Sequence, residues 1–200
     1  MTSFLSFVAG EARTHTVALL RLNEEMDDLH AVDQLYQELH AHTREHEAGE
    51  AYMLYLAGAC QNRLYTSALA YMRGQRNDAF GICRSAVEAA INAVLMHKGH
   101  LTNERFEEGG RAMLDLYRET KNPTHPNYVP ELLPLHANRD RLSKWGSHAE
   151  LSSIVFRLTE GLETGETRYY FFEAAKDQGE YRSLFLTNLT HFIDALAAFG

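Results

Sequence analysis

The stretch RNDAFGICRSAVEAAINAVLMHK, residues 76–98, decides the fold of this chain. Its apolar residues fall on most sides of a helix rather than on one stripe, a pattern typical of a helix with neighbours on several faces. They are Phe80, Ile82, Val87, Ala90, Ile91, Val94, Leu95 and Met96. We therefore expect this helix to lie at the centre of the protein.

A row of polar residues interrupts the apolar surface of that helix. Arg84, Glu88 and Asn92 are four positions apart, so they stack along one side of the helix. If the row faces water, an Arg and Glu pair at this spacing stabilises the helix only slightly and needs no function. If the helix is buried, the charges must be paired and hydrogen-bonded or must face a pocket. The second reading predicts a polar cleft.

The composition is that of one ordinary globular domain. The chain has 200 residues, of which 45% are hydrophobic and 23% are charged, and no linker rich in Pro, Gly or Ser divides it. We therefore expect a single domain over residues 1–200, with acidic N-terminal helices in 1–49 and the core of the fold in 50–198.

Negative charge is concentrated near the N-terminus. The net charge is −8, and residues 1–50 contain ten acidic residues against three arginines. Affinity for phosphate backbones comes from clustered Lys and Arg, so this balance argues against strong nonspecific binding of DNA or RNA by the whole surface. A local basic groove is compatible with it.

The cysteines and the N-terminal segment predict the compartment. Cys60 and Cys83 are too few for a disulfide framework or a metal knuckle, so we expect two small buried residues in a reducing environment. The start, MTSFLSFVAGEARTH, has no basic leader, and no run of about eighteen uncharged apolar residues occurs. These features predict a cytoplasmic protein without a membrane anchor.

Helical periodicity continues along most of the chain and predicts an all-α bundle of six to eight helices. The helices are expected over 11–22, 27–47, 50–73, 76–98, 102–121, 132–145, 147–162 and 180–199. Gly74 and Gly99 should end the helices that precede them. The helix over 102–121 is expected to continue through Gly109 and Gly110.

The remaining segments are predicted to be irregular. All four prolines lie in 122–134, which we expect to be a loop. Residues 163–167 should form a turn, and 169–172 fit either a short strand or the start of a helix. Ser147 and Glu150 have the spacing of a capping box, which predicts a helix that begins at Ser147.

A basic segment, RDRLSKWGSHAELSS over 139–153, surrounds the only tryptophan of the chain. It contains Arg139, Arg141, Ser143, Lys144 and His148. Histidine can act as general acid or base near neutral pH, Arg and Lys can stabilise negative charge, and a helix that begins nearby presents amide donors to an anion. The alternative is that His148 has a structural role at the start of a helix, and that Trp145 fills the hydrophobic space at the junction between the two helices.

A histidine run lies on the acidic N-terminal side of the chain. Glu38, His42 and His46 share one helix face, and helical bundles bind metals through such faces. No second helix supplies a matching Glu-x-x-His, so we interpret this face as solvated and expect neither a metal nor another cofactor.

The order of segments resembles a known family. A central RSAVEAAINAVL helix, a spacer helix, the RLSKWGSHAELS segment and a closing helix resemble the HEPN-like helical proteins of bacteria, which include abortive-infection proteins and stand-alone members. The resemblance covers roughly residues 50–198 and implies a HEPN-like bundle, a homodimer and a setting in phage defence or toxin–antitoxin pairs.

The same resemblance implies a candidate catalytic pair. In ribonuclease members, an Arg and a His with four to six residues between them form a metal-independent RNA-cleaving site across a dimer. Arg141 and His148 have this spacing at its upper limit, but Leu142 stands where the family has a polar residue. Arg139 is too far from His148 to replace Arg141. The resemblance therefore supports the fold more strongly than it supports ribonuclease activity.

Two functions follow from these observations. In the first, the protein is a binding module whose polar cleft holds a nucleotide or another anionic ligand, and the cleft residues are Arg84, Glu88, Asn92, Ser143 and Lys144. In the second, it is an endoribonuclease in which His148 acts on the ribose 2′-hydroxyl proton and Arg141 stabilises the phosphorane. Because Arg84 and Glu88 form a charged pair on an otherwise apolar helix, we expect both to be mostly buried and to contact the segment from Ser143 to His148. The second function requires that Arg141 and His148 converge on an open cleft.

Overall fold

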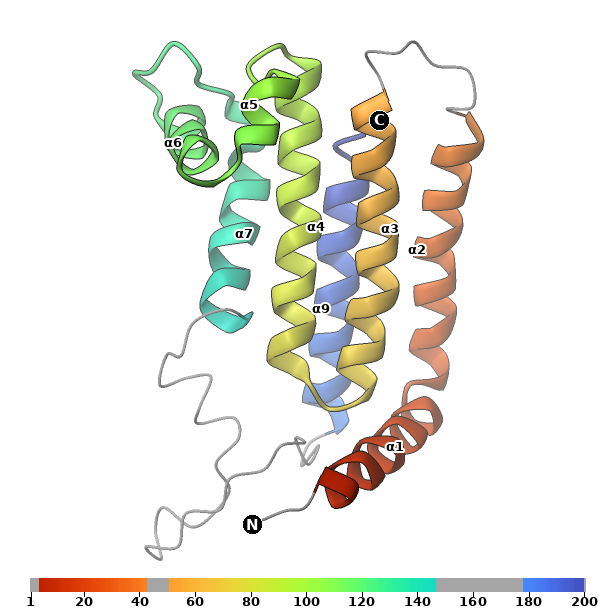
Figure 1. Ribbon diagram of the computed structural model, residues 1–200. Helices are drawn as coiled ribbons and strands as arrows, with labels where there is room; N and C mark the ends of the chain where they lie inside the picture. Colours follow the sequence, from red (N-terminus) through yellow and green to blue (C-terminus); the bar gives the residue numbers. More distant parts are fainter. Residues whose placement is uncertain (1–3, 43–50, 147–177, 200) are drawn as a thin grey trace, which may run out of the picture.

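The computed structural model describes residues 4–42, 51–146 and 178–199, and these residues form helices without a strand (Figure 1). The helices are α1 (Phe4–Arg21), α2 (Asn23–His42), α3 (Ala51–Met72), α4 (Arg76–His97), α5 (Asn103–Glu108), α6 (Gly110–Lys121), the 3-10 helix η2 (Pro130–Leu132), α7 (Leu133–Gly146) and α9 (Gln178–Leu196). The predicted all-α bundle is confirmed. The capping box at Ser147 and the predictions for 147–162, 163–167 and 169–172 lie outside the described residues.

Helix α4 occupies the centre of the bundle, as its composition predicts. It packs against α3, α7 and α9, and Figure 1 shows it between α3 and α7 with α9 behind. Phe80, Val87 and Ile91 are buried on it. Removing a side chain of this size from water stabilises the fold by about 1.5–3 kcal/mol.

Two glycines form the turns at the ends of this central hairpin. Gly74 has φ +77° and Gly99 has φ +73°, values that cost other residues strain. The Gly74 N–H donates to the Tyr71 carbonyl (2.9 Å) and the Gln75 N–H donates to the Ala70 carbonyl (2.9 Å). This pair of bonds is the Schellman motif, which satisfies the carbonyls at a helix end. Both predicted helix ends are confirmed.

The predicted continuous helix over 102–121 is wrong. Gly109 and Gly110 have φ of +58° and +56°, so the chain leaves the right-handed helix there and α5 and α6 are separate. Thr102 begins α5 as expected, because its Oγ1 accepts a hydrogen bond from the Arg105 N–H (3.3 Å).

The proline-containing loop is shorter than predicted. Pro130 begins η2, and Pro134 is the second residue of α7, where a missing N–H costs no hydrogen bond. The loop between α6 and η2 therefore ends at Val129.

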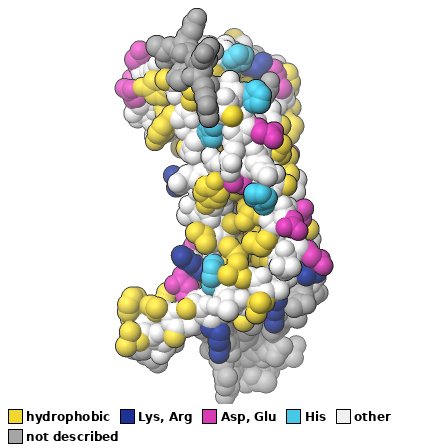
Figure 2. Space-filling model, turned by 90° about the vertical axis from the view of Figure 1, so that its right-hand side faces the viewer, with side chains coloured by type: hydrophobic (Ala, Val, Ile, Leu, Met, Phe, Trp, Pro, Cys, Tyr) yellow, Lys and Arg dark blue, Asp and Glu magenta, His cyan; other side chains and the backbone are white. Residues whose placement is uncertain are grey.

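Helix α1 begins at Phe4 rather than near residue 11, and it projects from the foot of the bundle (Figure 1). It contacts the bundle mainly through α3, and Ala18 is its buried residue. Figure 2 shows hydrophobic side chains gathered on this arm. Phe4, Leu5 and Leu20 are 77%, 78% and 78% exposed.

By length and hydropathy alone, α4 could span a membrane, and it is the one described helix that could. More than half of its apolar window is buried inside the bundle. The core helix of a globular protein has the same properties, so this is weak evidence for a membrane span.

Candidate functional site

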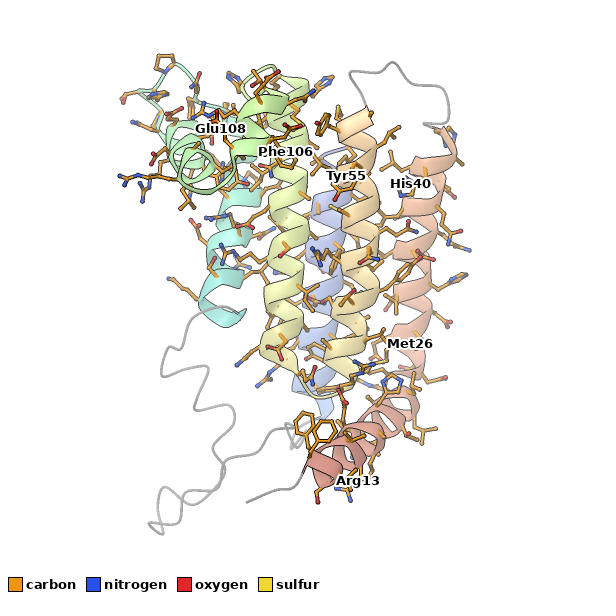
Figure 3. The ribbon with its side chains drawn as sticks, in the orientation of Figure 1. Arg13, Met26, His40, Tyr55, Phe106 and Glu108 are labelled. Atoms are coloured by element: carbon orange, nitrogen blue, oxygen red, sulfur yellow. The ribbon has the colours of Figure 1, made fainter. Side chains whose placement is uncertain are left out.

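The polar row on α4 lines an open cleft of about 750 Å³ between α4, α6 and α7. Arg84, Glu88 and Asn92 form one wall, and Arg139 joins them from α7. Helix α6 contributes the rest of the lining: Gly110, Arg111, Met113, Leu114, Asp115, Tyr117 and Arg118. In Figure 3 this region lies beside α5, which carries the labelled Phe106 and Glu108.

Glu88 is the central acceptor of the α4 wall. Its Oε1 accepts hydrogen bonds from Arg84 Nε (3.0 Å) and Arg139 Nε (2.8 Å), and Arg84 Nη2 lies 3.0 Å away. The side chains of Arg84, Glu88 and Arg139 are 25%, 27% and 12% exposed. The charges are therefore paired and half-buried, and one carboxylate is shared between two guanidinium groups.

Tyr117 contacts both Arg139 and Asn92 at the base of the cleft. The Arg139 guanidinium lies over the Tyr117 ring, 5.0 Å from its centroid, which is within the range of a cation–π interaction. The Tyr117 hydroxyl donates to Asn92 Oδ1 (2.7 Å). Burial, together with the negative charge of Glu88, raises the pKa of Tyr117, so its hydroxyl stays a neutral donor near neutral pH.

His136 lies behind Tyr117, away from the cleft lining. Its Nε2 is 3.1 Å from the Thr120 hydroxyl, and its ring meets the Tyr117 ring at a centroid distance of 5.8 Å. Burial, with the nearby Lys121 cation, lowers the pKa of His136 to about 4. His136 is therefore neutral at physiological pH and packs the wall rather than exchanging protons with a ligand.

The α6 rim repeats the arrangement of two arginines around one acid. Asp115 lies 3.8 Å from Arg111 and 3.1 Å from Arg118, whose side chains are 91% and 76% exposed. The cleft lining thus contains four arginines and two acidic residues. This local excess of positive charge contrasts with the net charge of −8 of the chain.

The structure brings together part of the predicted site. Arg84, Glu88 and Asn92 line the cleft, whereas Ser143 and Lys144 do not. Ser143 is half-buried and its hydroxyl donates to the Arg139 carbonyl (2.9 Å), while Lys144 is exposed. Glu88 of α4 pairs with Arg139 of α7, which lies one helical turn before Ser143.

Arg141, one residue of the predicted catalytic pair, is not among the cleft residues. Arg141 is exposed on α7, and its charge acts on His191 of α9. Burial, and then the Arg141 cation, lower the pKa of His191. His148 lies outside the described residues.

Sequence reasoning missed the contribution of α6. Arg111 and Arg118 are seven residues apart, which is about two helical turns, so they share one face with Asp115 between them. That spacing was a usable signal. It could not indicate that these residues border the same cleft as the α4 row, because the direction of α6 is set by the break at Gly109 and Gly110.

The described residues contain no group of three or more His, Cys, Asp or Glu side chains that could hold a metal ion. His42 Nδ1 lies 2.8 Å from the carbonyl of Glu38 within its own helix. Residues 43–50, which include His46, lie outside the description.

Comparisons with family models, with curated proteins and with solved structures returned no match to this chain.

Proposed function

We propose that the protein is a binding module and that the cleft between α4, α6 and α7 holds a nucleotide or another small anionic ligand. The observation that carries the proposal is the charge of the lining: four arginines and two acidic residues line one cleft in an acidic protein. We include in the proposal the HEPN-like assignment and the cellular settings that it implies.

The chemistry of the lining suits phosphate or carboxylate. A guanidinium group offers paired N–H donors that match the oxygens of either anion, and it keeps its charge at all physiological pH values. Arg139 is 12% exposed, and a charge–charge interaction is stronger at such a site than in open water. A volume of about 750 Å³ falls within the range of small-molecule sites in proteins.

We also propose that the protein is a homodimer, as the resemblance implies. The exposed apolar residues of α1 support this proposal, because contiguous apolar surface on a globular protein commonly marks an interaction site. Light scattering coupled to size exclusion tests it, with twice the chain mass expected. A monomeric mass at micromolar concentration would contradict it.

Calorimetric titration with AMP, ATP and uncharged adenosine tests the ligand class. We expect the two nucleotides to bind and adenosine to bind at least tenfold more weakly. Arg118→Gln and Arg139→Lys should weaken nucleotide binding, the second because lysine cannot reproduce the planar donor pair. Arg13→Gln is the matched control, since Arg13 is exposed on α1, far from α6 (Figure 3).

Two results would contradict the proposal. One is equal binding of adenosine and AMP, and the other is equal loss in the Arg13→Gln control. Metal-independent cleavage of single-stranded RNA in EDTA, abolished in His148→Ala, would replace the proposal with the ribonuclease that the resemblance suggests.

A further inference from the structure

We infer that a pocket at the end of the bundle opposite α1, which we call the end pocket, binds an uncharged small molecule with an apolar body and one hydroxyl group. The inference is independent of the proposed function, because the end pocket shares no residue with the cleft between α4, α6 and α7. It comes from the way in which apolar and polar residues are divided within the pocket.

The end pocket has a volume of about 340 Å³. It lies where the end of α4 meets the start of α3, η2, the start of α7 and the residues that follow α9. Figure 1 shows the start of α3, the end of α4 and the C-terminus at this end of the bundle, away from α1. Five separate parts of the chain therefore build its walls, and its volume falls within the range of small-molecule sites.

The inner walls of the end pocket are apolar. Leu132 and Leu135 are buried and belong to the core, and Val94 and Phe199 pack against the core beside them. The other apolar lining residues are Met53, Ala197 and Ala198. These side chains offer no strong hydrogen-bonding group, so the walls favour a ligand body whose hydrocarbon is removed from water on binding.

The polar residues lie at the mouth of the end pocket. His97, Lys98 and Glu131 line it and are exposed, and the Lys98 ammonium group donates a hydrogen bond to Glu131 Oε1. This bond lowers the pKa of Glu131, so its carboxylate is ionised at neutral pH. One positive and one negative charge therefore offset each other at the mouth, in contrast to the four arginines that line the cleft.

A hydroxyl group matches this pair of opposite charges. The ammonium group has three N–H donors, of which one is used by Glu131, and the carboxylate has further acceptor sites. A ligand hydroxyl can therefore accept from Lys98 and donate to Glu131 at the same time. An anionic ligand would meet the like charge of Glu131, and a cationic ligand would meet that of Lys98.

1-Octanol, octanoate and octylammonium test the inference, because they have the same apolar chain and differ in the charge of the polar end. Calorimetric titrations are made at pH 8, where histidine ordinarily carries no charge. We expect 1-octanol to bind roughly tenfold more tightly than either ion, since a like charge opposes each ion. 1-Butanol should bind at least roughly tenfold more weakly than 1-octanol, because it buries a shorter chain.

Substitutions at the mouth should create opposite charge preferences. Lys98→Gln leaves the Glu131 charge without its partner, so octylammonium should bind about tenfold more tightly than octanoate. Glu131→Gln leaves the Lys98 charge instead, so octanoate should become the tighter of the two ions. Both residues are exposed, and a thermal melt checks that the variants are folded.

A filled pocket supplies the second test. Ala198→Phe places a ring in the end pocket and should abolish 1-octanol binding, and Ala197→Phe, at an exposed lining position, replaces it if the first variant does not fold. Arg13→Gln, on α1 at the other end of the bundle, is the matched control and should leave the affinities unchanged (Figure 3).

Three results would overturn the inference: equal binding of 1-octanol and the two ions, the same ion preference in both mouth variants, and 1-octanol binding that is absent in the wild type or unchanged in the filled variant. Loss of 1-octanol binding in the filled variant with unchanged AMP affinity would support a site separate from the cleft. A failure of AMP to bind to the wild type would contradict the proposed function alone.

Discussion

The two sides of α4 bury polar groups in different ways. Towards α3 and α9 the polar groups are neutral: the Ser67 hydroxyl donates to the Ala79 carbonyl (2.9 Å) and accepts from Asn188 Nδ2 (2.7 Å), and both side chains are fully buried. Towards α6 and α7 they are charged and half-buried around Glu88. A neutral hydrogen-bonded pair of this kind serves packing, whereas half-buried charges cost desolvation, so we expect the charged side to serve a ligand.

Our predictions test this difference. Substitutions on the α3–α9 side should change stability and leave ligand affinity unchanged in the folded protein. Substitutions at the cleft surface should do the reverse. Substitutions of residues beneath the cleft, such as Tyr117, should have intermediate effects on stability.

The largest expected effect is at Tyr71, on the α3–α9 side. Tyr71 is fully buried, its hydroxyl donates to the Tyr181 carbonyl (3.1 Å), and the Tyr181 hydroxyl donates back to the Tyr71 carbonyl (3.0 Å). Tyr71→Ala should lower the free energy of unfolding by about 3–5 kcal/mol, because it leaves a cavity and removes the hydroxyl that donates to the Tyr181 carbonyl. Urea denaturation measures it. Tyr55→Ala, at a position 70% exposed, is the control and should change little.

The second effect is a loss of stability in acid that comes from His136. Its pKa is about 4 in the folded protein against an ordinary value of 6.5, so below pH 6.5 the unfolded chain binds a proton that the folded protein does not. The free energy of unfolding should therefore fall by roughly 3 kcal/mol as the pH drops from 7 to 4. At neutral pH the full stability is present.

Urea denaturation at several pH values measures this effect, and His136→Gln is the control because glutamine does not titrate. In that variant the slope between pH 6.5 and 4 should be smaller. His191, whose pKa is also lowered by burial, should supply part of the slope that is left. An unchanged slope in His136→Gln would show that His136 is not the source.

A smaller effect is expected beneath the cleft. Tyr117→Phe removes the hydroxyl that donates to Asn92 Oδ1, and Asn92 is only 8% exposed. The unpaired amide oxygen should cost about 1–2 kcal/mol of stability. Tyr65→Phe, which removes a hydroxyl bonded to Asp33 at a position 44% exposed, should cost less. Equal losses at the two positions would contradict the expectation that the buried Tyr117–Asn92 hydrogen bond stabilises the protein more than the exposed Tyr65–Asp33 bond.

The same contrast explains what sequence reasoning could reach. The core position of α4 follows from its own apolar residues, and the ends at Gly74 and Gly99 follow from local backbone chemistry, so both could be predicted. The cleft depends on contacts between residues far apart in sequence, such as Glu88 with Arg139, 51 positions away. Periodicity within one helix shows which residues share a face, but it does not show which other helix that face meets.

The break at Gly109 and Gly110 illustrates the limit. Two adjacent glycines in a helical pattern are compatible with a weakened helix or with a turn, and the pattern over 102–121 favoured continuity. The observed positive φ at both positions separates α6 from α5, and the arginines of α6 reach the cleft as a result.

The smallest expected effect on stability is at the α6 rim, and it is the sharpest test of the difference between the two sides of α4. The Arg118 side chain is 76% exposed and its pair with Asp115 is made within one helix, so solvent screens the interaction. Arg118→Gln should therefore change the free energy of unfolding by less than about 0.5 kcal/mol. Parallel urea curves for the wild type and the variant measure it, and AMP titration of the same samples measures affinity. A loss of affinity without a loss of stability would place Arg118 at a binding surface. If the free energy of unfolding falls by more than about 1 kcal/mol and affinity is unchanged, the α6 arginines stabilise the helix and the cleft is not a binding site.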